Sequence, residues 1–467
     1  MITRLLFVLL LGFSFQLQAQ DVTGTWNGTL EVQGMKLRIV FHVEKNENAY
    51  STKMDSPDQG AKGIPTDQTT FVDNKLTVKA SALGMTYEGT FNQEKSTLEG
   101  TFVQGPGKFP LTFTRAAVEK PRRPQDPTDF PYHQEEVSFD NTSDQVTLAG
   151  TLTLPKDQKV KQVVVLVSGS GPQDRNEEVG VFNHRPFLVL SDYLTRNGIG
   201  VLRYDDRGVA ASTGDFGKAT SLDFSEDAEA AVEYLKNRKD LAEAKVGIVG
   251  HSEGGMIAPM VASRNKAVDF IVLLAGPGIP IDQLMLLQAK LISDSQAVPT
   301  AVSDVNQKAL GKAYKYLREN PEKEHVELKE DLVRIFKDAL KDFPPMVQSG
   351  IGDIDKFAND EAEGLLSPWF LYFIRFNPSD YLTKTNCPVY ALNGTLDLQV
   401  SSKENLEGIK KSLAEAKNQT VKIEALEGLN HLFQQATTGA VSEYAQIEET
   451  FQEATMAKVA AWITSQQ

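Results

Sequence analysis

The chain has 467 residues, of which 41% are apolar and 24% charged, a composition typical of a folded globular protein with two or three domains. Its 48 Lys and Arg and 62 Asp and Glu residues give a formal net charge of -14. No Lys/Arg run of the size used for nucleic acid or anionic membranes is present, so the sequence argues against both as partners.

Residues 1–19 have the pattern of a secretory signal peptide. Arg4 precedes an apolar run over Leu5–Phe15, and Ala19 is a small residue at the expected cleavage site. The run is shorter than the ~20 residues that a membrane-spanning helix needs. We therefore expect an exported protein, periplasmic or extracellular, with no integral membrane span. Cys387 is the only cysteine, which excludes an intramolecular disulfide and suggests a buried structural thiol.

Residues 20–115 form a series of short alternating runs. Apolar and polar side chains alternate over Met35–Val43, and Gly, Asn and Asp separate this run from similar ones that follow. Thr23–Trp26 resembles the opening of lipocalin-like barrels. The pattern predicts a small all-β domain, a barrel or sandwich filled by its own side chains, with a ligand-binding interior as the alternative. Residues 116–134 carry four prolines among charged residues and are predicted to be a stiff linker.

Residues 135–467 change to a different pattern. Two alternating runs, 136–140 and 146–154, predict a hairpin. Continuous apolar runs then alternate with helical segments, as expected for strands buried on both faces of a mostly parallel sheet in the α/β class. The predicted strands are 163–167, 200–204, 246–249, 271–274, 389–392 and 421–425, and the helices between them include 187–196, 222–237 and 256–262.

This alternation is interrupted over residues 281–381. The insert has no strong strand signal and several amphipathic helical segments, so it predicts a helical cap over the carboxyl edge of the sheet. Trp369, Phe373 and Phe376 recur at helical spacing, which is typical of core residues. Trp369 and Phe373 are nonetheless candidates for a substrate-binding wall, since aromatic side chains of a cap can serve both purposes.

The stretch Lys245–Ile257, KVGIVGHSEGGMI, combines a strand, a tight turn and the start of a helix. Glycines flank Ser252 on both sides in the pattern G-x-S-x-G, which is typical of a nucleophile elbow when a strand precedes it and a helix follows. Ser252 is therefore the predicted nucleophile.

A serine nucleophile needs an imidazole base, a carboxylate and oxyanion donors. Of the six histidines, His431 follows the last predicted strand, at the sheet edge where catalytic groups gather. Asp397 follows the preceding strand and is the predicted acid, with Asp380 and Glu427 as the alternatives considered. These choices give the chain order nucleophile, acid, base.

Backbone N–H groups are the predicted oxyanion donors, one from Glu253 and one from Ser170 or Gly171 in the glycine-rich loop after strand 163–167. His184 is a candidate substrate contact. No cofactor or metal is predicted, since no clustered ligand spacing such as H-E-x-x-H is present.

From residue 135 to the C-terminus the chain resembles exported bacterial α/β-hydrolases of the serine-aminopeptidase-like and prolyl-oligopeptidase-like group. The resemblance implies an α/β-hydrolase fold and Ser252, Asp397 and His431 as the triad, and such relatives are often carboxylesterases. The residues that carry it are Ser168–Arg175 (SGSGPQDR), Arg203–Gly208 (RYDDRG), Gly250–Gly255 (GHSEGG), Asn393–Gly394 with Asp397, and Asn430–His431.

The sequence therefore predicts a serine hydrolase that cleaves small-molecule carboxylic esters through an acyl-enzyme. Aminopeptidase, acyl-peptide or thioester cleavage is the enzymatic alternative, and the carboxylates Asp360, Glu361 and Glu363 of the cap could hold a substrate amine. An exported ligand-binding protein with an inert hydrolase domain is the non-enzymatic alternative.

Overall fold

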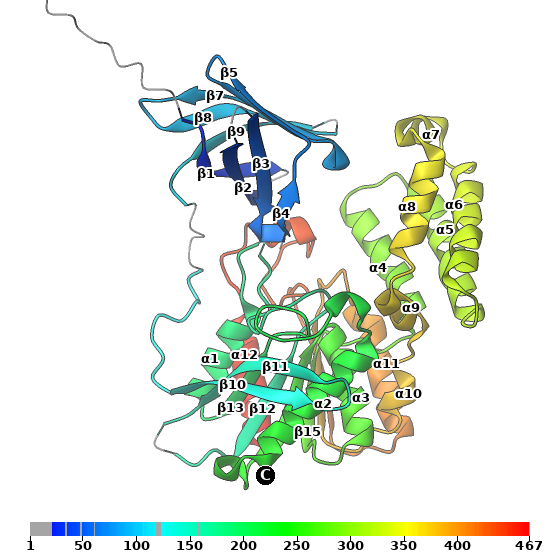
Figure 1. The fold of residues 1–467 in the computed structure, drawn as a ribbon. Coiled ribbons are helices and arrows are strands. Elements are labelled where there is room, and N and C mark those ends of the chain that lie inside the picture. The colour runs from blue at the N-terminus through cyan, green and yellow to red at the C-terminus, as the bar shows by residue number, and fades with distance from the viewer. Residues whose placement is uncertain are drawn as a thin grey trace, which may run out of the picture. The chain divides into compact units, whose positions relative to one another are not determined.

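The computed structural model describes residues 21–32, 35–46, 49–59, 61–105, 107–117, 123–156, 158–180 and 182–466. The chain divides into two compact units, Met1–Lys120 and Pro121–Gln467, called unit 1 and unit 2 below (Figure 1). The predicted signal peptide, residues 1–19, lies outside the described residues, as do residues 118–122 of the predicted linker.

Unit 1 is a closed antiparallel barrel. Its strands follow the order β2-β1-β9-β8-β7-β6-β5-β3, β3 pairs again with β2 to close the ring, and β4 is added to β3. The strands are β1 (Gly24–Val32), β2 (Met35–Asn46), β3 (Ala49–Ser56), β4 (Ala61–Pro65), β5 (Gln68–Val72), β6 (Lys75–Ala80), β7 (Met85–Asn92), β8 (Thr97–Gln104) and β9 (Gly107–Thr114). Of the two architectures predicted for this segment, the structure has the barrel.

The barrel interior is filled by its own side chains. Trp26, Phe41, Tyr87 and Phe113 are each 0% exposed. The rings of Phe41 and Phe113 stack with centroids 4.5 Å apart, and the Trp26 indole donates to the Val22 carbonyl at 2.8 Å. The barrel interior is therefore a packed core, because large aromatic rings fill it and the indole N–H has a hydrogen-bond partner within the barrel.

Unit 2 contains a mostly parallel sheet, as the continuous apolar runs predicted. The strand order is β10-β11-β13-β12-β14-β15-β16-β17; the pairs β10–β11 and β11–β13 are antiparallel and the others parallel. The strands are β10 (His133–Asn141), β11 (Val146–Leu154), β12 (Gln162–Val167), β13 (Gly200–Tyr204), β14 (Lys245–His251), β15 (Phe270–Leu274), β16 (Val389–Gly394) and β17 (Val421–Leu426).

Helices cover both faces of this sheet (Figure 1). Successive side chains of β12 point to opposite faces of the sheet, so that Val163 and Val165 belong to one core cluster and Val164 and Leu166 to the other. Both faces are therefore apolar and need to be covered. The first cluster is covered by α2 (Ser221–Asn237), α3 (Glu253–Arg264) and α11 (Ser402–Glu415), and the second by α1 (Pro186–Arg196) and α12 (Glu453–Thr464).

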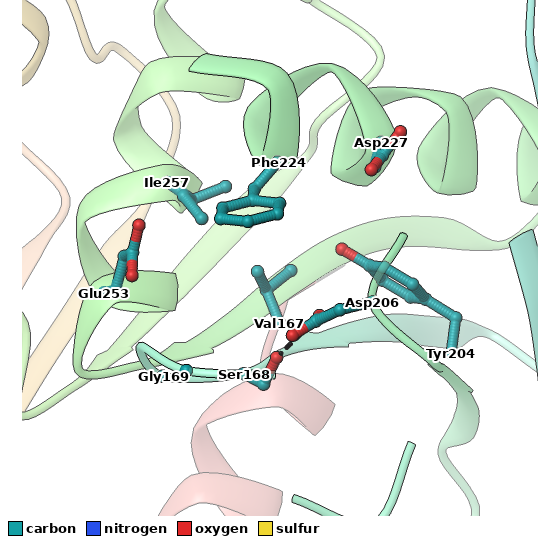
Figure 2. Close-up of a pocket in the computed structure, with 10 residues that line it drawn as sticks. Val167, Ser168, Gly169, Tyr204, Asp206, Phe224, Asp227, Glu253 and Ile257 are labelled. Atoms are coloured by element: carbon teal, nitrogen blue, oxygen red, sulfur yellow. Dashed lines mark hydrogen bonds between the residues drawn. The ribbon is translucent and has the colours of Figure 1, made fainter. Parts of the chain in front are cut away.

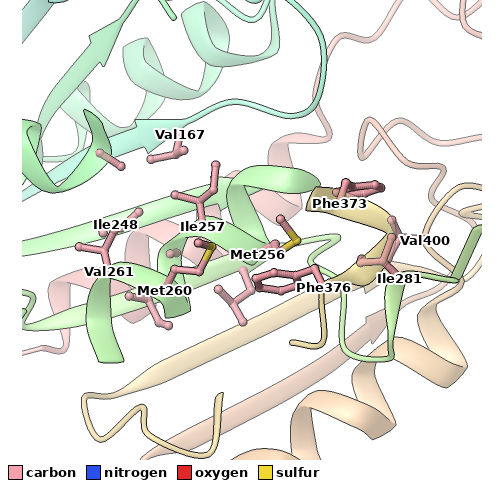
Figure 3. Close-up of a cluster of buried hydrophobic side chains, with 14 of the residues drawn as sticks. Val167, Ile248, Met256, Ile257, Met260, Val261, Ile281, Phe373, Phe376 and Val400 are labelled. Carbon is pink, nitrogen blue, oxygen red and sulfur yellow. The ribbon is translucent and has the colours of Figure 1, made fainter. Parts of the chain in front are cut away.

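The insert after β15 is helical, as predicted. Its helices are α4 (Ile281–Ser295), α5 (Thr300–Glu319), α6 (His325–Leu340), α7 (Pro345–Ile351), α8 (Ile354–Gly364), α9 (Pro368–Arg375) and α10 (Ser379–Leu382). Figure 3 shows Phe373 and Phe376 in one buried cluster with Met256 of α3 and Ile281 of α4. The insert is therefore joined to the sheet region by a continuous apolar core. Within the described ranges, no helix is both long and apolar enough to cross a membrane.

Candidate active site

Ser252 lies at the sharp corner between β14 and α3, with φ 54° and ψ -114°, a left-handed conformation that is strained for a residue with a side chain. The neighbouring glycines permit this corner. A Cβ on Gly250 would lie 1.9 Å from the Gly254 carbonyl oxygen, and a Cβ on Gly254 would lie 2.0 Å from the Val167 carbonyl oxygen. The helix therefore starts in direct contact with β14 and β12, which is the geometry of a nucleophile elbow.

His431 and Asp397 meet beyond the carboxyl ends of β17 and β16. The His431 Nδ1 lies 2.7 Å from the Asp397 Oδ2, and the two residues are 5% and 3% exposed. The other carboxylate oxygen accepts from the backbone N–H of Gln399 at 2.8 Å and of Val400 at 2.9 Å. Asp397 is thus held by its own turn and holds the imidazole, while Asp380 and Glu427 are exposed.

The loop of His431 also contacts the elbow. The rings of His251 and His431 have centroids 4.9 Å apart, and the His251 Nε2 lies 3.0 Å from the backbone oxygen of His431. The Ser252 hydroxyl forms no capping hydrogen bond to α3, the helix that it precedes.

The predicted oxyanion loop, Ser168–Gly171, lies directly against Ser252. A Cβ on Gly169 would lie 3.2 Å from the Ser252 Cβ, so a side chain at this position would crowd the nucleophile. The Gly169 N–H donates to Glu177 at 2.8 Å, so it is not available to bind an oxyanion. Glu253 is the first residue of α3, where the backbone N–H has no acceptor within the helix. The first predicted donor therefore belongs to the residue directly after the nucleophile, and the second, from Ser170 or Gly171, stays a prediction.

Comparison with known proteins agrees with this geometry. Residues 158–335 match the family model described as serine aminopeptidase, S33. The chain is 31% identical over 285 residues to Esterase EstD of Thermotoga maritima, covering 61% of this chain and 58% of that protein, so it spans little more than half of this relative.

Two solved structures are similar at lower identity. The Pyrococcus furiosus esterase Pf2001 is 16% identical, with 74% of this chain and 95% of that chain covered and a TM-score of 0.43. Est1E of Butyrivibrio proteoclasticus, solved with ferulic acid bound, is 14% identical, with 71% and 98% covered and a TM-score of 0.41.

Unit 2 has the α/β-hydrolase fold. Its strand order and its elbow, together with the family match over residues 158–335, confirm the resemblance to α/β-hydrolases noted in the sequence.

Beside the elbow of the hydrolase domain lies a small pocket, shown in Figure 2. On its wall, Asp206 accepts from the Ser168 hydroxyl at 3.1 Å and from the Gln173 N–H at 3.0 Å. Burial raises the pKa of Asp206 well above its usual range. This carboxyl therefore binds both Ser168, at the start of the oxyanion loop, and Gln173, two residues beyond its end. The lining residues are Val167, Ser168, Gly169, Gly171, Tyr204, Asp206, Phe224, Asp227, Glu253 and Ile257.

The side chain of Glu253 connects the elbow to the cap. Its Oε1 accepts from the Ser221 hydroxyl at 2.6 Å and from the Trp369 indole N–H at 2.9 Å. Burial raises the pKa of Glu253. Trp369 stacks on Phe373 with centroids 4.7 Å apart, and Phe373 is only 7% exposed. Trp369 thus lies next to the site, whereas Phe373 is a core residue that supports it.

His184 does not lie in a position to contact a substrate, which corrects the prediction. Its ring is 0% exposed, with Nδ1 2.9 Å from the Thr450 hydroxyl and Nε2 2.9 Å from the Tyr444 backbone oxygen. Burial lowers the pKa of His184 to about 4. It is a neutral core histidine that joins the loop before α1 to the segment before α12.

Glu177 and the side chain of His251 were not singled out from the sequence. His251 was visible within the elbow motif, but only as a neighbour of the nucleophile. Its Nδ1 lies 2.8 Å from the Glu177 Oε1, and both residues are buried. Glu177 carries no local signal, because its partner is 74 residues away in the chain.

Proposed function

We propose that this protein is a serine hydrolase that cleaves small-molecule carboxylic esters through an acyl-enzyme. Ser252 attacks the ester carbonyl while the Nε2 of His431 accepts its proton, and Asp397 holds the imidazole in place. The C–O bond to the alcohol then breaks and His431 gives the proton to the leaving alcohol. Water, activated by His431, hydrolyses the acyl-enzyme and releases the acid. The backbone N–H groups of Glu253 and of Ser170 or Gly171 bind the oxyanion. The observation that carries the proposal is the 2.7 Å contact between His431 and Asp397 beside a serine in an elbow.

The named relative supports the ester-cleaving reaction, since it is an esterase. Short p-nitrophenyl esters and a fluorophosphonate probe provide the test. We expect the wild type to turn over the ester and to be labelled at Ser252. The variant Ser252→Ala should fold normally and lose both properties. Ester turnover that survives in this variant would refute the proposal.

Aminopeptidase or acyl-peptide cleavage is the second candidate, because the matching family model describes serine aminopeptidases. Two of the three cap carboxylates considered for holding a substrate amine are already paired with lysines, which argues against this use of them. Asp360 pairs with Lys356, and the Glu363 Oε2 lies 2.6 Å from the Lys329 Nζ. Turnover of p-nitrophenyl acetate and of aminoacyl p-nitroanilides by the same preparation separates the two reactions.

Export is also a proposal, and it depends on the signal-like pattern of residues 1–19. Expression of the full-length gene in a bacterial host, followed by fractionation and N-terminal sequencing, tests it. We expect a mature chain that begins within a residue or two of Gln20 in the periplasm or medium. Retention of Met1 in the cytoplasm would contradict it.

A further inference from the structure

Three segments of the hydrolase domain converge on one buried pair, Glu177 and His251. The Glu177 Oε1 accepts from the backbone N–H of Gly169 at 2.8 Å and lies 2.8 Å from the His251 Nδ1. The His251 Nε2 lies 3.0 Å from the backbone oxygen of His431. The oxyanion loop, the elbow and the loop of the base are therefore joined through two side chains that are 3% and 6% exposed.

The hydrogen-bond acceptors around Glu177 and His251 indicate which of their atoms carry protons. A backbone carbonyl oxygen can only accept, so the His251 Nε2 carries a proton. The Glu177 Oε1 receives the Gly169 N–H and faces the second ring nitrogen. Burial by itself lowers the pKa of His251, but the charge and hydrogen bond of Glu177 and the His431 carbonyl outweigh it and raise the pKa. An imidazolium paired with a carboxylate satisfies all three contacts.

An amide cannot replace this carboxylate. Both N–H groups converge on Oε1, while Oε2 is buried and has no hydrogen-bond partner in the described part of the chain. If an amide oxygen occupied the Oε1 position, His251 would be a buried cation without a counter-charge. If an amide nitrogen occupied it, its protons would oppose the Gly169 N–H. The first case removes the counter-charge of His251, and the second removes the contact with Gly169.

We propose that Glu177 and His251 form a positioning pair that sets the distances between the oxyanion loop, Ser252 and His431. The inference rests on the proposed serine hydrolase function and adds two positioning residues to it. The separation it controls is small, since a Cβ on Gly169 would lie 3.2 Å from the Ser252 Cβ. When the pair is broken, the oxyanion loop and the base loop can shift independently of the nucleophile, and the transition state loses alignment.

The test compares Glu177→Gln with Glu178→Gln. The control removes the same charge one residue along the same loop, where Glu178 pairs with the partly exposed Arg185. The readout is the rate constant for fluorophosphonate labelling of Ser252, with the labelling endpoint counting folded sites. We expect Glu177→Gln to label about 10- to 100-fold more slowly per site and the control to label as the wild type does. Equal rates for the wild type and Glu177→Gln would overturn the positioning pair.

Two further measurements separate positioning from loss of folding. With p-nitrophenyl acetate, the Glu177→Gln variant should lose kcat while KM stays within about twofold, because alignment rather than binding changes. The double variant Glu177→Gln/His251→Gln should label within about threefold of the rate of either single variant, because each single substitution already breaks the same connection. Multiplicative losses would show that the residues act separately and would overturn the pair. A wild type that fails to label at Ser252 would refute the proposed function instead.

Discussion

The titratable side chains around Ser252 show how burial and partners together set charge. Burial raises the pKa of Asp206 and of Glu253, neither of which has a cationic partner among the described residues, and it lowers the pKa of His184 to about 4. His251 is equally buried, yet the carboxylate of Glu177 raises its pKa. Residue type alone does not predict these charge states. Each depends on whether the interior supplies an opposite charge.

Asp397→Asn tests the role of the acid at the residue scale. The amide can still be placed beside His431, but it cannot select the tautomer that leaves Nε2 free to accept the serine proton. We expect kcat for p-nitrophenyl acetate to fall on the order of 10³- to 10⁴-fold. Asp380→Asn, which changes an exposed carboxylate, is the matched control and should keep its activity. A loss of less than about tenfold for Asp397→Asn would exclude Asp397 as the acid.

Glu253→Gln should change the pH dependence of stability. The pKa of Glu253 is higher in the folded state than its value of about 4.5 in the unfolded state. Below that pH the carboxyl is protonated in both states and does not lower the free energy of unfolding. The cost of burying the carboxyl grows as the pH rises from there through the folded-state pKa, by about 1.4 kcal/mol for each pH unit in that interval. Relative to the wild type, the variant should therefore gain free energy of unfolding as the pH rises above about 4.5. Urea unfolding at several pH values measures this gain, and a pH-independent difference would contradict it.

At the scale of elements, the site depends on how closely α3 approaches the strands. Gly254 lies against the backbone of β12, and Gly255 lies against Gly276, since a Cβ there would be 2.6 Å from the Gly276 Cα. The same helix begins with Glu253, which receives a hydrogen bond from Trp369 of α9. The elbow is therefore positioned by the sheet on one side and contacts the cap on the other.

Gly254→Ala tests the strand–helix crossing. The added methyl group would lie 2.0 Å from the Val167 carbonyl oxygen, and backbone atoms cannot move aside as a flexible side chain can. We expect the free energy of unfolding to fall by about 1–3 kcal/mol or more and Ser252 labelling to be lost. Gly364→Ala in α8 has nothing within 4 Å of the new Cβ and should stay within about 1 kcal/mol of wild type. Equal stability of the two variants in urea would refute the close packing.

At the scale of the whole molecule, the two units have separate cores. The cluster around Trp26, Phe41 and Tyr87 contains only residues of unit 1, whereas the two clusters of unit 2 lie on opposite faces of its sheet. A separate core is what an independently stable domain requires.

Trp26→Ala tests this independence. Removing a fully buried indole should destabilise unit 1 by about 3–5 kcal/mol, while turnover of p-nitrophenyl acetate by the hydrolase domain stays unchanged. Urea unfolding followed by circular dichroism and by activity measures both effects. Val72→Ala, at a side chain that is 65% exposed, is the control and should change neither. Activity lost in parallel with the unfolding of unit 1 would show that the units depend on each other.

The sequence by itself predicted a mostly parallel α/β sheet because strands buried on both faces appear as continuous apolar runs, and the resemblance of its motifs implied the α/β-hydrolase fold. The elbow was visible for a similar reason, since close backbone contact demands glycine at fixed positions. Asp397 and His431 were identified from their positions after successive strands, and the structure brings their side chains within 2.7 Å of each other. These signals are local, and short segments carry them.

Only the tertiary structure decided the roles of residues whose partners are distant in the chain. His184 was a candidate substrate contact until the fold placed it against Thr450, 266 residues away. Trp369 contacts Glu253 across 116 residues, and Glu177 contacts His251 across 74. The sequence around a single residue does not predict such contacts, because burial and hydrogen bonding depend on which elements pack together. The elbow serine could therefore be read from the sequence, whereas the interactions that align its surroundings could not.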